Sequence, residues 1–241
     1  MKIVVMCNDS FYSTNFLSKL TSNHNYTVIS PTKPYPNKGV LKTVLYVRKT
    51  RGLKFIFKRF FQNIKNSLIT SQQNNLKSIC KKLEFELIKC KVLDSQEIIA
   101  KVKSLEPDII CSISLNHLVP KNIFSLSKFL SVNIHPSLLP SYRGPSPIFW
   151  VLHNKEKYSG ITIHELTPKF DKGKIIYQKK YSILGMNEKE LSDKSSEESA
   201  FCFNHLLENL TNLKDIEVDS SLKESYYPRP TYRERIIFGA K

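Results

Sequence analysis

Short apolar runs and helical apolar stripes alternate along the first part of the chain. Residues 2–7 (KIVVMC) form a β-branched run that is typical of a buried strand, and residues 26–32 (YTVISPT) form a second one. Between them, Phe16, Leu17 and Leu20 recur at helical spacing. A strand, a helix and a strand in this order predict parallel pairing through a right-handed crossover.

The alternation continues beyond this first unit. Ser95 is an N-cap candidate for an amphipathic helix that Pro107 ends, just before a strand over 109–113. Strands that alternate with helices over the first 135 residues predict an α/β fold, with a mostly parallel sheet and helices on both faces. The other predicted elements are a helix running into a strand over 75–90, a short helix before a strand over 130–135, a helix over 146–157, strands over 158–168 and after 173, and a long amphipathic helix over 187–210.

Two segments depart from this pattern. Residues 53–68 combine an apolar helical face with lysines that lie mostly opposite to it. We interpret them as a helix that covers the sheet; a basic helix that touches an anionic membrane or a partner is the alternative. The last 30 residues show no strong period. We therefore expect one domain over 1–210 and a tail or small appended element over 211–241.

Composition narrows the functional classes. No N-terminal signal peptide is visible, and no run approaches the roughly 20 apolar residues of a membrane span, so we expect a cytoplasmic protein. The net charge of +16 favours anionic partners, or simply reflects a lysine-rich, well-solvated surface. The five cysteines show no CxxC spacing, and no HxH or HExxH pattern occurs, so no metal is predicted.

Chemistry is most plausible where the strand over 130–135 ends. Asn133 and His135 are two residues apart, so their side chains share one face at the carboxyl end of a strand, where open α/β sheets bind ligands. Pro136 keeps His135 extended, and further prolines stiffen the loop that follows. Asp171, just before Gly173, would orient the imidazole if the fold brings them together. A lone histidine is more often structural, however, and an acid at a turn is more often an ordinary turn residue.

Together these motifs resemble the signature of the folate-dependent formyltransferase family. The resemblance rests on 133–140 (NIHPSLLP), on 142–144 (YRG) and on 171–173 (DKG), with 107–120 and 160–176 similar to the segments that flank them. It implies a Rossmann-like domain that binds 10-formyltetrahydrofolate and transfers the formyl group to an amine. It also implies that Asn133, His135 and Asp171 form the catalytic trio.

The chemistry of such a transfer suits these side chains. A neutral amine attacks the formyl carbon, and Asn133 with a protonated His135 would stabilise the negative charge on the formyl oxygen. Either His135 or a water held by Asp171 would accept the proton of the amine, and the sequence leaves this choice open. By resemblance, the pterin of the folate would contact Leu115, Asn116, His117, Leu118, Leu138, Leu139, Pro140, Thr167 and Phe170.

The amine that accepts the formyl group is less sharply indicated. Methionyl-tRNA formyltransferases normally carry a further C-terminal barrel domain, and glycinamide ribonucleotide formyltransferases begin with a Gly-rich loop where this chain reads CNDSFYSTNF. The basic aromatic segment near 44–66, the loop over 137–147 (SLLPSYRGPSP) and the ending over 226–230 (YYPRP) are more similar to the sugar-nucleotide N-formyltransferases.

We therefore expect a nucleotide-linked amino sugar as acceptor, in the form of a dTDP-linked 3-amino- or 4-amino-dideoxyhexose for O-antigen or another surface polysaccharide. Phe11, Tyr12 and Arg143 are the candidate substrate contacts, and a homodimer is the default oligomeric state. The alternative from another class is a non-catalytic module of this fold that binds nucleic acid or an anionic surface. Retention of all three catalytic positions argues against such a module.

Overall fold

The computed structural model describes most of the chain. Its described residues are 1–32, 45, 48, 49, 52, 75–212, 219 and 221–239. The predicted basic helix over 53–68 lies outside these residues, as does nearly all of the basic aromatic segment near 44–66.

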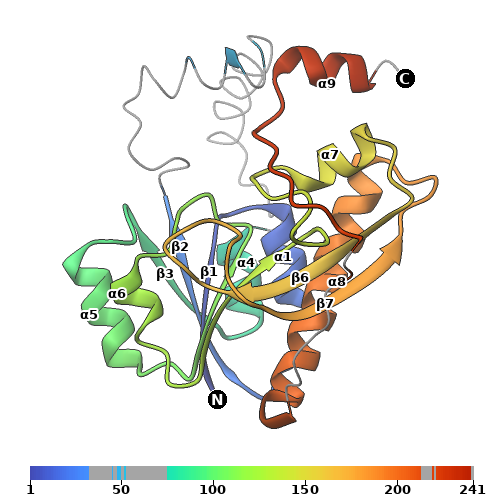
Figure 1. The fold of residues 1–241 in the computed structure, drawn as a ribbon. Helices are drawn as coiled ribbons and strands as arrows, with labels where there is room; N and C mark the ends of the chain where they lie inside the picture. Colours follow the sequence, from blue (N-terminus) through green and yellow to red (C-terminus); the bar gives the residue numbers. More distant parts are fainter. Residues whose placement is uncertain are drawn as a thin grey trace.

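A single mostly parallel sheet organises the described residues. Its seven strands are β1 (Lys2–Cys7), β2 (Asn25–Pro31), β3 (Glu86–Cys90), β4 (Ile109–Ile113), β5 (Leu130–His135), β6 (Tyr158–Glu165) and β7 (Ile175–Ser182). Their spatial order is β3-β2-β1-β4-β5-β6-β7 (Figure 1). The strands from β3 to β5 pair in parallel, whereas β6 and β7 are added antiparallel. The predicted α/β fold with a mostly parallel sheet is confirmed.

Helices lie on both faces of this sheet, as predicted. In chain order they are α1 (Phe11–Ser18), α4 (Leu76–Lys82), α5 (Gln96–Leu105), α6 (Lys121–Phe124), α7 (Pro147–His153), α8 (Glu188–Glu208), the 3₁₀ turn η1 (Leu210–Asn212) and α9 (Tyr232–Gly239). Helices α1, α4 and α8 lie on one face and α5 and α6 on the other (Figure 1). Side chains of the first three join one apolar cluster of the core, and those of the other two join the second.

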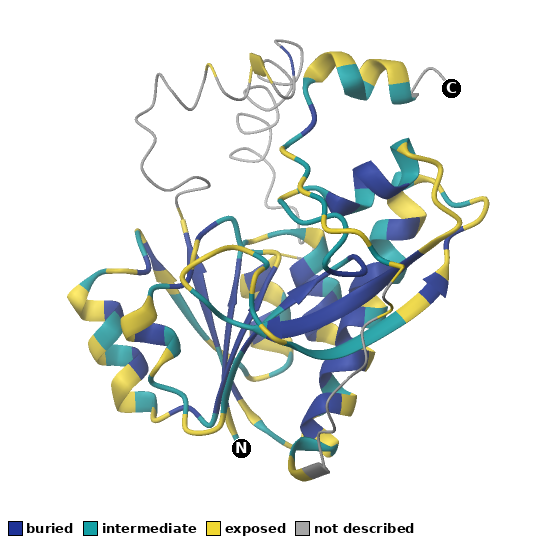
Figure 2. Cartoon of the chain, viewed as in Figure 1, coloured by how far each residue is buried: buried dark blue, intermediate teal, exposed yellow. Residues whose placement is uncertain are grey.

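Alternation along the central strands produces the two layers of the core. On β1, Ile3 and Val5 belong to one apolar cluster, whereas Val4 and Met6 belong to the other. All four are almost completely buried, and Figure 2 shows the central strands buried between the helices. Burial of each such side chain contributes about 1.5–3 kcal/mol, so a strand buried on both faces reads as a continuous apolar run.

Polar caps explain where two of the predicted helices begin. Ser95 Oγ accepts a hydrogen bond from Ile98 N at 3.4 Å at the start of α5. Asn187 and Glu190 form a reciprocal capping box at the start of α8, in which each side chain satisfies a backbone N–H of the first turn.

The C-terminal segment over 221–239 is more ordered than the lack of periodicity suggested. It runs along the loop that follows β5 and ends in α9 (Figure 1). Thr231 and Glu234 cap this helix: Glu234 Oε2 accepts from Thr231 N at 2.6 Å, and Thr231 Oγ1 accepts from Glu234 N at 3.3 Å. Its Ile236 and Ile237 are exposed, which explains why no apolar stripe marked it.

Two further observations concern the class of protein. Among the described helices, none combines the length and the apolar character that crossing a membrane requires. All five cysteines are buried with free thiols.

Candidate active site

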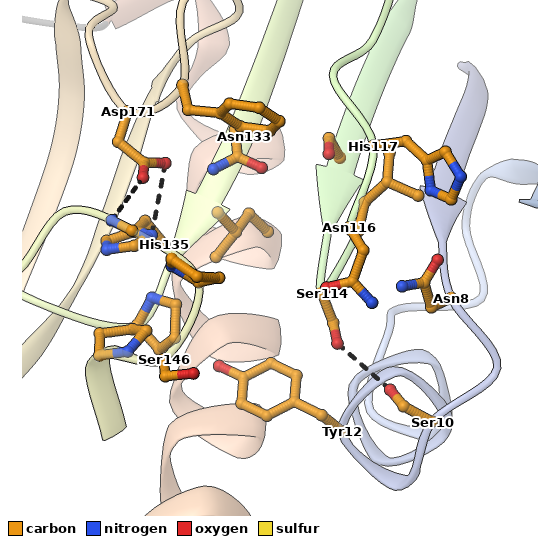
Figure 3. A pocket seen from close by; sticks show the side chains of 18 of the residues that line it. Asn8, Ser10, Tyr12, Ser114, Asn116, His117, Asn133, His135, Ser146 and Asp171 are labelled. Carbon is orange, nitrogen blue, oxygen red and sulfur yellow. Dashed lines mark hydrogen bonds and ion pairs between the residues drawn. The ribbon is translucent and has the colours of Figure 1, made fainter. Parts of the chain in front are cut away.

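A cavity of about 1020 Å³ lies beyond the carboxyl ends of β1, β4 and β5 (Figure 3). The chain runs from β1 outward to β3 and then returns to β4, so the strand order reverses beside β1. Open α/β sheets bind ligands at such a reversal. Asn133, His135 and Asp171 all line this cavity. The structure therefore brings together the three residues that the sequence motifs singled out.

β5 presents its two polar side chains on one face. Val132 and Ile134 are packed in the core, so Asn133 and His135 alternate with them and point to the other side, as predicted. The register of β5 against β6 places His164 directly opposite Asn133. The polar face of β5 is thus continued by a polar residue of the neighbouring strand.

The loop after β5 is fixed to β6 by its backbone. Thr162 Oγ1 donates to Ser137 O at 2.6 Å and accepts from Leu139 N at 3.1 Å. The loop then turns back, and Tyr142 O accepts a hydrogen bond from His135 Nε2 at 2.9 Å. Because a carbonyl oxygen only accepts, this contact puts a proton on Nε2 and leaves Nδ1 as the second, titrating nitrogen.

Asp171 reaches His135 because its own loop returns closely against β6. A Cβ on Gly173 would collide with the carbonyl oxygen of Glu165, so glycine is required for this approach. Asp171 itself has φ 53°, a left-handed conformation that aspartate tolerates better than most residues. Its Oδ2 accepts from Gly144 N at 2.9 Å, which ties it to the loop after β5.

Opposing effects set the protonation of the buried pair. His135 Nδ1 lies 3.5 Å from Asp171 Oδ1, and both side chains are less than one tenth exposed. Burial lowers the pKa of His135 below its usual value, although the charge of Asp171 and the Tyr142 carbonyl act in the opposite direction. Burial alone would raise the pKa of Asp171, but the two histidines and Gly144 N–H lower it to about 2. At neutral pH the site therefore holds a neutral imidazole beside a carboxylate.

His164 is a site residue that the sequence motifs did not single out. Its Nδ1 donates to Glu165 O at 2.9 Å, so its Nε2 is left to accept from Asn133 Nδ2 at 3.1 Å. This contact fixes the orientation of the Asn133 amide. The same Nε2 lies 3.7 Å from Asp171 Oδ1. The available signal was the alternation of β6, which places Thr162 and His164 on one face.

The residues expected to contact folate divide into two groups. Six of the nine line the cavity: Leu115, Asn116, His117, Leu118, Thr167 and Phe170. Folate contacts from Leu138, Leu139 and Pro140 stay a prediction, because these three residues do not line the cavity. The reason is the direction of the loop: Leu138 packs so closely on β6 that a Cβ at Gly160 would overlap its side chain. Both leucines are buried there.

The three candidate substrate contacts have different surroundings. Tyr12 lines the cavity, but its hydroxyl donates to Ser195 O at 3.0 Å and so joins α1 to α8. Phe11 instead lines a smaller hollow of about 200 Å³ beside α4. Arg143 also lies outside the cavity lining, and its Nη2 pairs with Glu224 Oε1 at 2.6 Å. Of the three, only Tyr12 keeps a place in the site.

Side chains from the C-terminal segment complete the cavity. Tyr226, Arg229 and Arg235 line it, and Arg235 Nη1 lies 3.3 Å from Oε1 of Glu188 at the start of α8. Sequence reasoning did not assign these residues to the site, because nothing in the local pattern placed the end of the chain beside β5. Among the described residues, no group of three or more His, Cys, Asp or Glu side chains is arranged to hold a metal ion.

Comparison with known protein families shows which family the chain belongs to. The model of the formyl transferase family matches residues 61–201, more than half of the chain. The chain belongs to the formyl transferase family. Asn133, His135 and Asp171 all lie within the part that the family shares.

Curated relatives in this family are longer proteins. The methionyl-tRNA formyltransferase of Thermotoga maritima is 34% identical over 166 residues, which cover 67% of this chain and 50% of that protein. The methionyl-tRNA formyltransferase of Ehrlichia ruminantium is 36% identical over 114 residues, 47% of this chain and 38% of that one. The chain therefore spans half or less of the length of these relatives.

Solved structures agree with the fold. The N-formyltransferase from Helicobacter canadensis, in complex with folinic acid and dTDP-3-aminofucose, has a TM-score of 0.60 and 18% identity, over 95% of this chain and 71% of that one. The phosphoribosylglycinamide formyltransferase from Streptococcus pneumoniae has a TM-score of 0.59 and 15% identity, over 88% of this chain and 99% of that one. At this level of identity, the likeness shows the fold alone.

Proposed function

We propose that the protein transfers the formyl group of 10-formyltetrahydrofolate to the amine of a nucleotide-linked amino sugar, such as a dTDP-amino-dideoxyhexose. The observation that carries the proposal is the meeting of Asn133, His135 and Asp171 in one cavity of a chain from the formyl transferase family.

Asn133 is the proposed oxyanion donor. When the lone pair of the amine attacks the formyl carbon, the C=O electrons move to the oxygen and leave it negatively charged. One N–H of Asn133 Nδ2 points to His164, and the other is available for this oxygen. One such donor, held in place before the reaction, lowers the barrier by about 3 kcal/mol.

His135 is the proposed general base. The attacking nitrogen becomes positively charged and must lose a proton. The lowered pKa of His135 keeps its imidazole neutral, and the Tyr142 carbonyl holds the proton on Nε2, so Nδ1 is the atom that accepts. The electrons on the oxyanion then re-form the C=O bond, the C–N10 bond of the folate breaks, and N10 takes up the proton held by His135. These observations favour a neutral His135 over the protonated form that we expected from the sequence.

Asp171 is proposed to act through its charge. With a pKa of about 2 it is itself a poor base, but its carboxylate stabilises the imidazolium that forms 3.5 Å away. The distance between His135 Nδ1 and Asp171 Oδ1 is longer than that of a short hydrogen bond. Protonation of Nδ1 would strengthen the attraction between the two side chains. A water held by Asp171, the alternative base, would have to pass the proton to a weaker acceptor.

The proposed folate site is the apolar side of the cavity. Leu115, Leu118, Leu166 and Phe170 line it there, and the flat faces of the pterin ring can stack on such side chains. Phe170 and Leu118 are exposed in the structure, so a bound ring would remove apolar surface from water. This arrangement would leave the formyl group beside Asn133.

A nucleotide sugar is the proposed acceptor because of two features that resemble sugar-nucleotide N-formyltransferases, the loop over 137–147 and the ending over 226–230. They lie against one another here: Tyr227 N donates to Arg143 O at 2.8 Å, and the Tyr142 and Tyr227 rings stack. The Helicobacter canadensis protein, which binds folinic acid with dTDP-3-aminofucose, shares the fold. Methionyl-tRNA is the second candidate, because the relative that is 34% identical is named a methionyl-tRNA formyltransferase.

A panel of acceptors tests the proposal. Purified protein with 10-formyltetrahydrofolate should release tetrahydrofolate with a dTDP-amino sugar and give a product heavier by one formyl group. Turnover of methionyl-tRNA or glycinamide ribonucleotide, with none on any amino sugar, would refute the acceptor. Salt-sensitive binding of nucleic acid without any turnover would instead favour a non-catalytic module.

A further inference from the structure

The cavity has a polar side that the transfer chemistry does not use. Besides the leucines and Phe170, its lining includes the polar residues Ser10, Tyr12, Ser146, Glu188, Ser192, Arg229 and Arg235. Two of these, Arg229 and Arg235, come from the C-terminal segment. Arginine is the side chain best suited to phosphate, because its planar guanidinium donates two parallel hydrogen bonds.

The C-terminal segment is held firmly enough to present side chains in defined positions. Ser225 Oγ accepts from Tyr142 N at 2.9 Å, and Ser225 O accepts from Arg143 N at 3.0 Å. Further along, Trp150 Nε1 donates to Pro228 O at 2.8 Å. A Cβ on Gly144 would collide with the Tyr227 carbonyl, so the segment and the loop are in close contact. These contacts fix the residues just before Arg229.

The two arginines are themselves held in place by partners. Arg229 Nη2 donates to Asn116 Oδ1 in the loop after β4, so this side chain reaches across the cavity. Arg235 pairs with Glu188 and also lies 5.0 Å from the ring centroid of Phe149. A guanidinium has five N–H donors and can bind several partners at once.

The turn between β1 and α1 is a poor phosphate site here, although a helix begins there. Ser10 Oγ accepts from Ser13 N at 3.2 Å and so occupies the position that an anion would take at this helix end. Asp9 also lines the cavity at this turn, and its carboxylate accepts from Leu76 N. A second negative charge beside Asp9 would be repelled.

We propose that the C-terminal segment forms the phosphate-binding wall of the acceptor site, with Arg229 and Arg235 contacting the phosphate groups of the acceptor. This inference rests on the proposed formyl transfer to an acceptor that carries phosphate. A nucleotide sugar, glycinamide ribonucleotide and tRNA all share that chemistry. The acceptor amine then lies between this wall and His135, and the folate lies on the far side.

Variants of the two arginines test this wall, with Arg233→Gln as the matched control. Arg233 lies on α9 next to this pair but is exposed and does not line the cavity. Arg229→Gln and Arg235→Gln should each raise the KM for the phosphate-bearing acceptor roughly tenfold or more, and leave the KM for 10-formyltetrahydrofolate within about twofold. Arg233→Gln should match the wild type. Arg229→Lys and Arg235→Lys keep the charge but lose the planar guanidinium with its paired N–H donors. Their KM for the acceptor should lie between that of the wild type and that of the Gln variants.

A binding measurement separates this inference from the proposed function. Calorimetric titration with dTDP alone, which needs no turnover, should show weaker binding to Arg229→Gln and Arg235→Gln than to the wild type and to Arg233→Gln. Inorganic pyrophosphate in a parallel titration tests the phosphate contacts without the base. An equal loss of dTDP affinity in Arg229→Gln, Arg235→Gln and Arg233→Gln would overturn the proposed phosphate-binding wall. A rise in the KM for 10-formyltetrahydrofolate alone would also overturn it. Failure of the wild type to transfer formyl to any acceptor would instead overturn the proposed function.

Discussion

His135 experiences opposing influences from the atoms around it. Burial disfavours its charged form, whereas the carboxylate of Asp171 favours it. The outcome is a neutral imidazole that gains a nearby counter-charge once it takes a proton. A base of this kind is ready to accept a proton at neutral pH and is stabilised after it has done so.

Asp171→Asn is expected to separate these two influences. The charge of Asp171 raises the pKa of His135, so its removal should lower that pKa further. The acidic limb of the kcat/KM profile should therefore shift to lower pH, while kcat at neutral pH falls because the imidazolium loses its counter-charge. A pH–rate profile measures both effects. Asp94→Asn, an exposed residue elsewhere, is the control. An unshifted acidic limb in Asp171→Asn would contradict the assignment of His135 as the base.

His164 is expected to act on catalysis through Asn133. In His164→Leu the acceptor for Asn133 Nδ2 is lost, so the amide can rotate away from the formyl oxygen. We expect kcat to fall by about tenfold or more, with both KM values near those of the wild type. His164→Gln, which keeps an acceptor, should recover part of the rate. Equal kcat in His164→Leu and wild type would remove His164 from this role.

At the residue scale, sequence reasoning succeeded where spacing alone fixes geometry. Asn133 and His135 share a face because they are two apart on a strand. Asp171 came from resemblance, since no spacing rule joins it to His135. His164 was missed because its partner lies across an antiparallel pair, whose register depends on the whole hairpin.

At the scale of elements, the site depends on two loops that return closely against β6. The loop after β5 is fixed through Thr162, and the loop before β7 can return only because residue 173 is a glycine. Both loops meet where Gly144 N donates to Asp171. The backbone of one loop therefore orients the carboxylate of the other.

Gly173→Ala is expected to displace the loop that carries Asp171. The new methyl group would overlap the carbonyl oxygen of Glu165, so the loop must move. We expect loss of roughly 2 kcal/mol of unfolding free energy and a clear drop in kcat. Gly185→Ala is the control: it has φ 75° and open space around it, so it should cost about 1 kcal/mol and leave kcat unchanged. Thermal melts and kcat of the two variants test this, and equal behaviour would contradict it.

The elements themselves were largely predictable, because their caps and apolar stripes are local features. The end of the chain was not. α9 has no apolar stripe, and its place beside the cavity results from contacts with residues 140–150, far away in sequence. The direction of the loop after β5 was equally hidden. Its prolines indicated a stiff rim, but not that Leu138 packs on β6 instead of lining the cavity.

At the scale of the whole molecule, alternation of strands and helices predicted the mostly parallel sheet and its helical layers. The reversal of strand order between β1 and β4 could not be read from the sequence, because it depends on which strands pair. That reversal positions the cavity, and the antiparallel β6–β7 pair brings His164 and Asp171 to it. We propose that residues 1–210 form one domain with 211–241 as an appended element, and that its described residues 221–239 complete the acceptor side.

Transfer of a labelled formyl group measures the central claim most directly. 10-Formyltetrahydrofolate labelled at the formyl carbon is mixed with a dTDP-amino sugar and either the wild type or His135→Ala, whose folding is first verified by its thermal melt. The label should move to the sugar amine with the wild type, and the rate should fall by a hundredfold or more in His135→Ala. Label that stays on the folate with the wild type, or moves equally fast in a folded His135→Ala, would contradict the account.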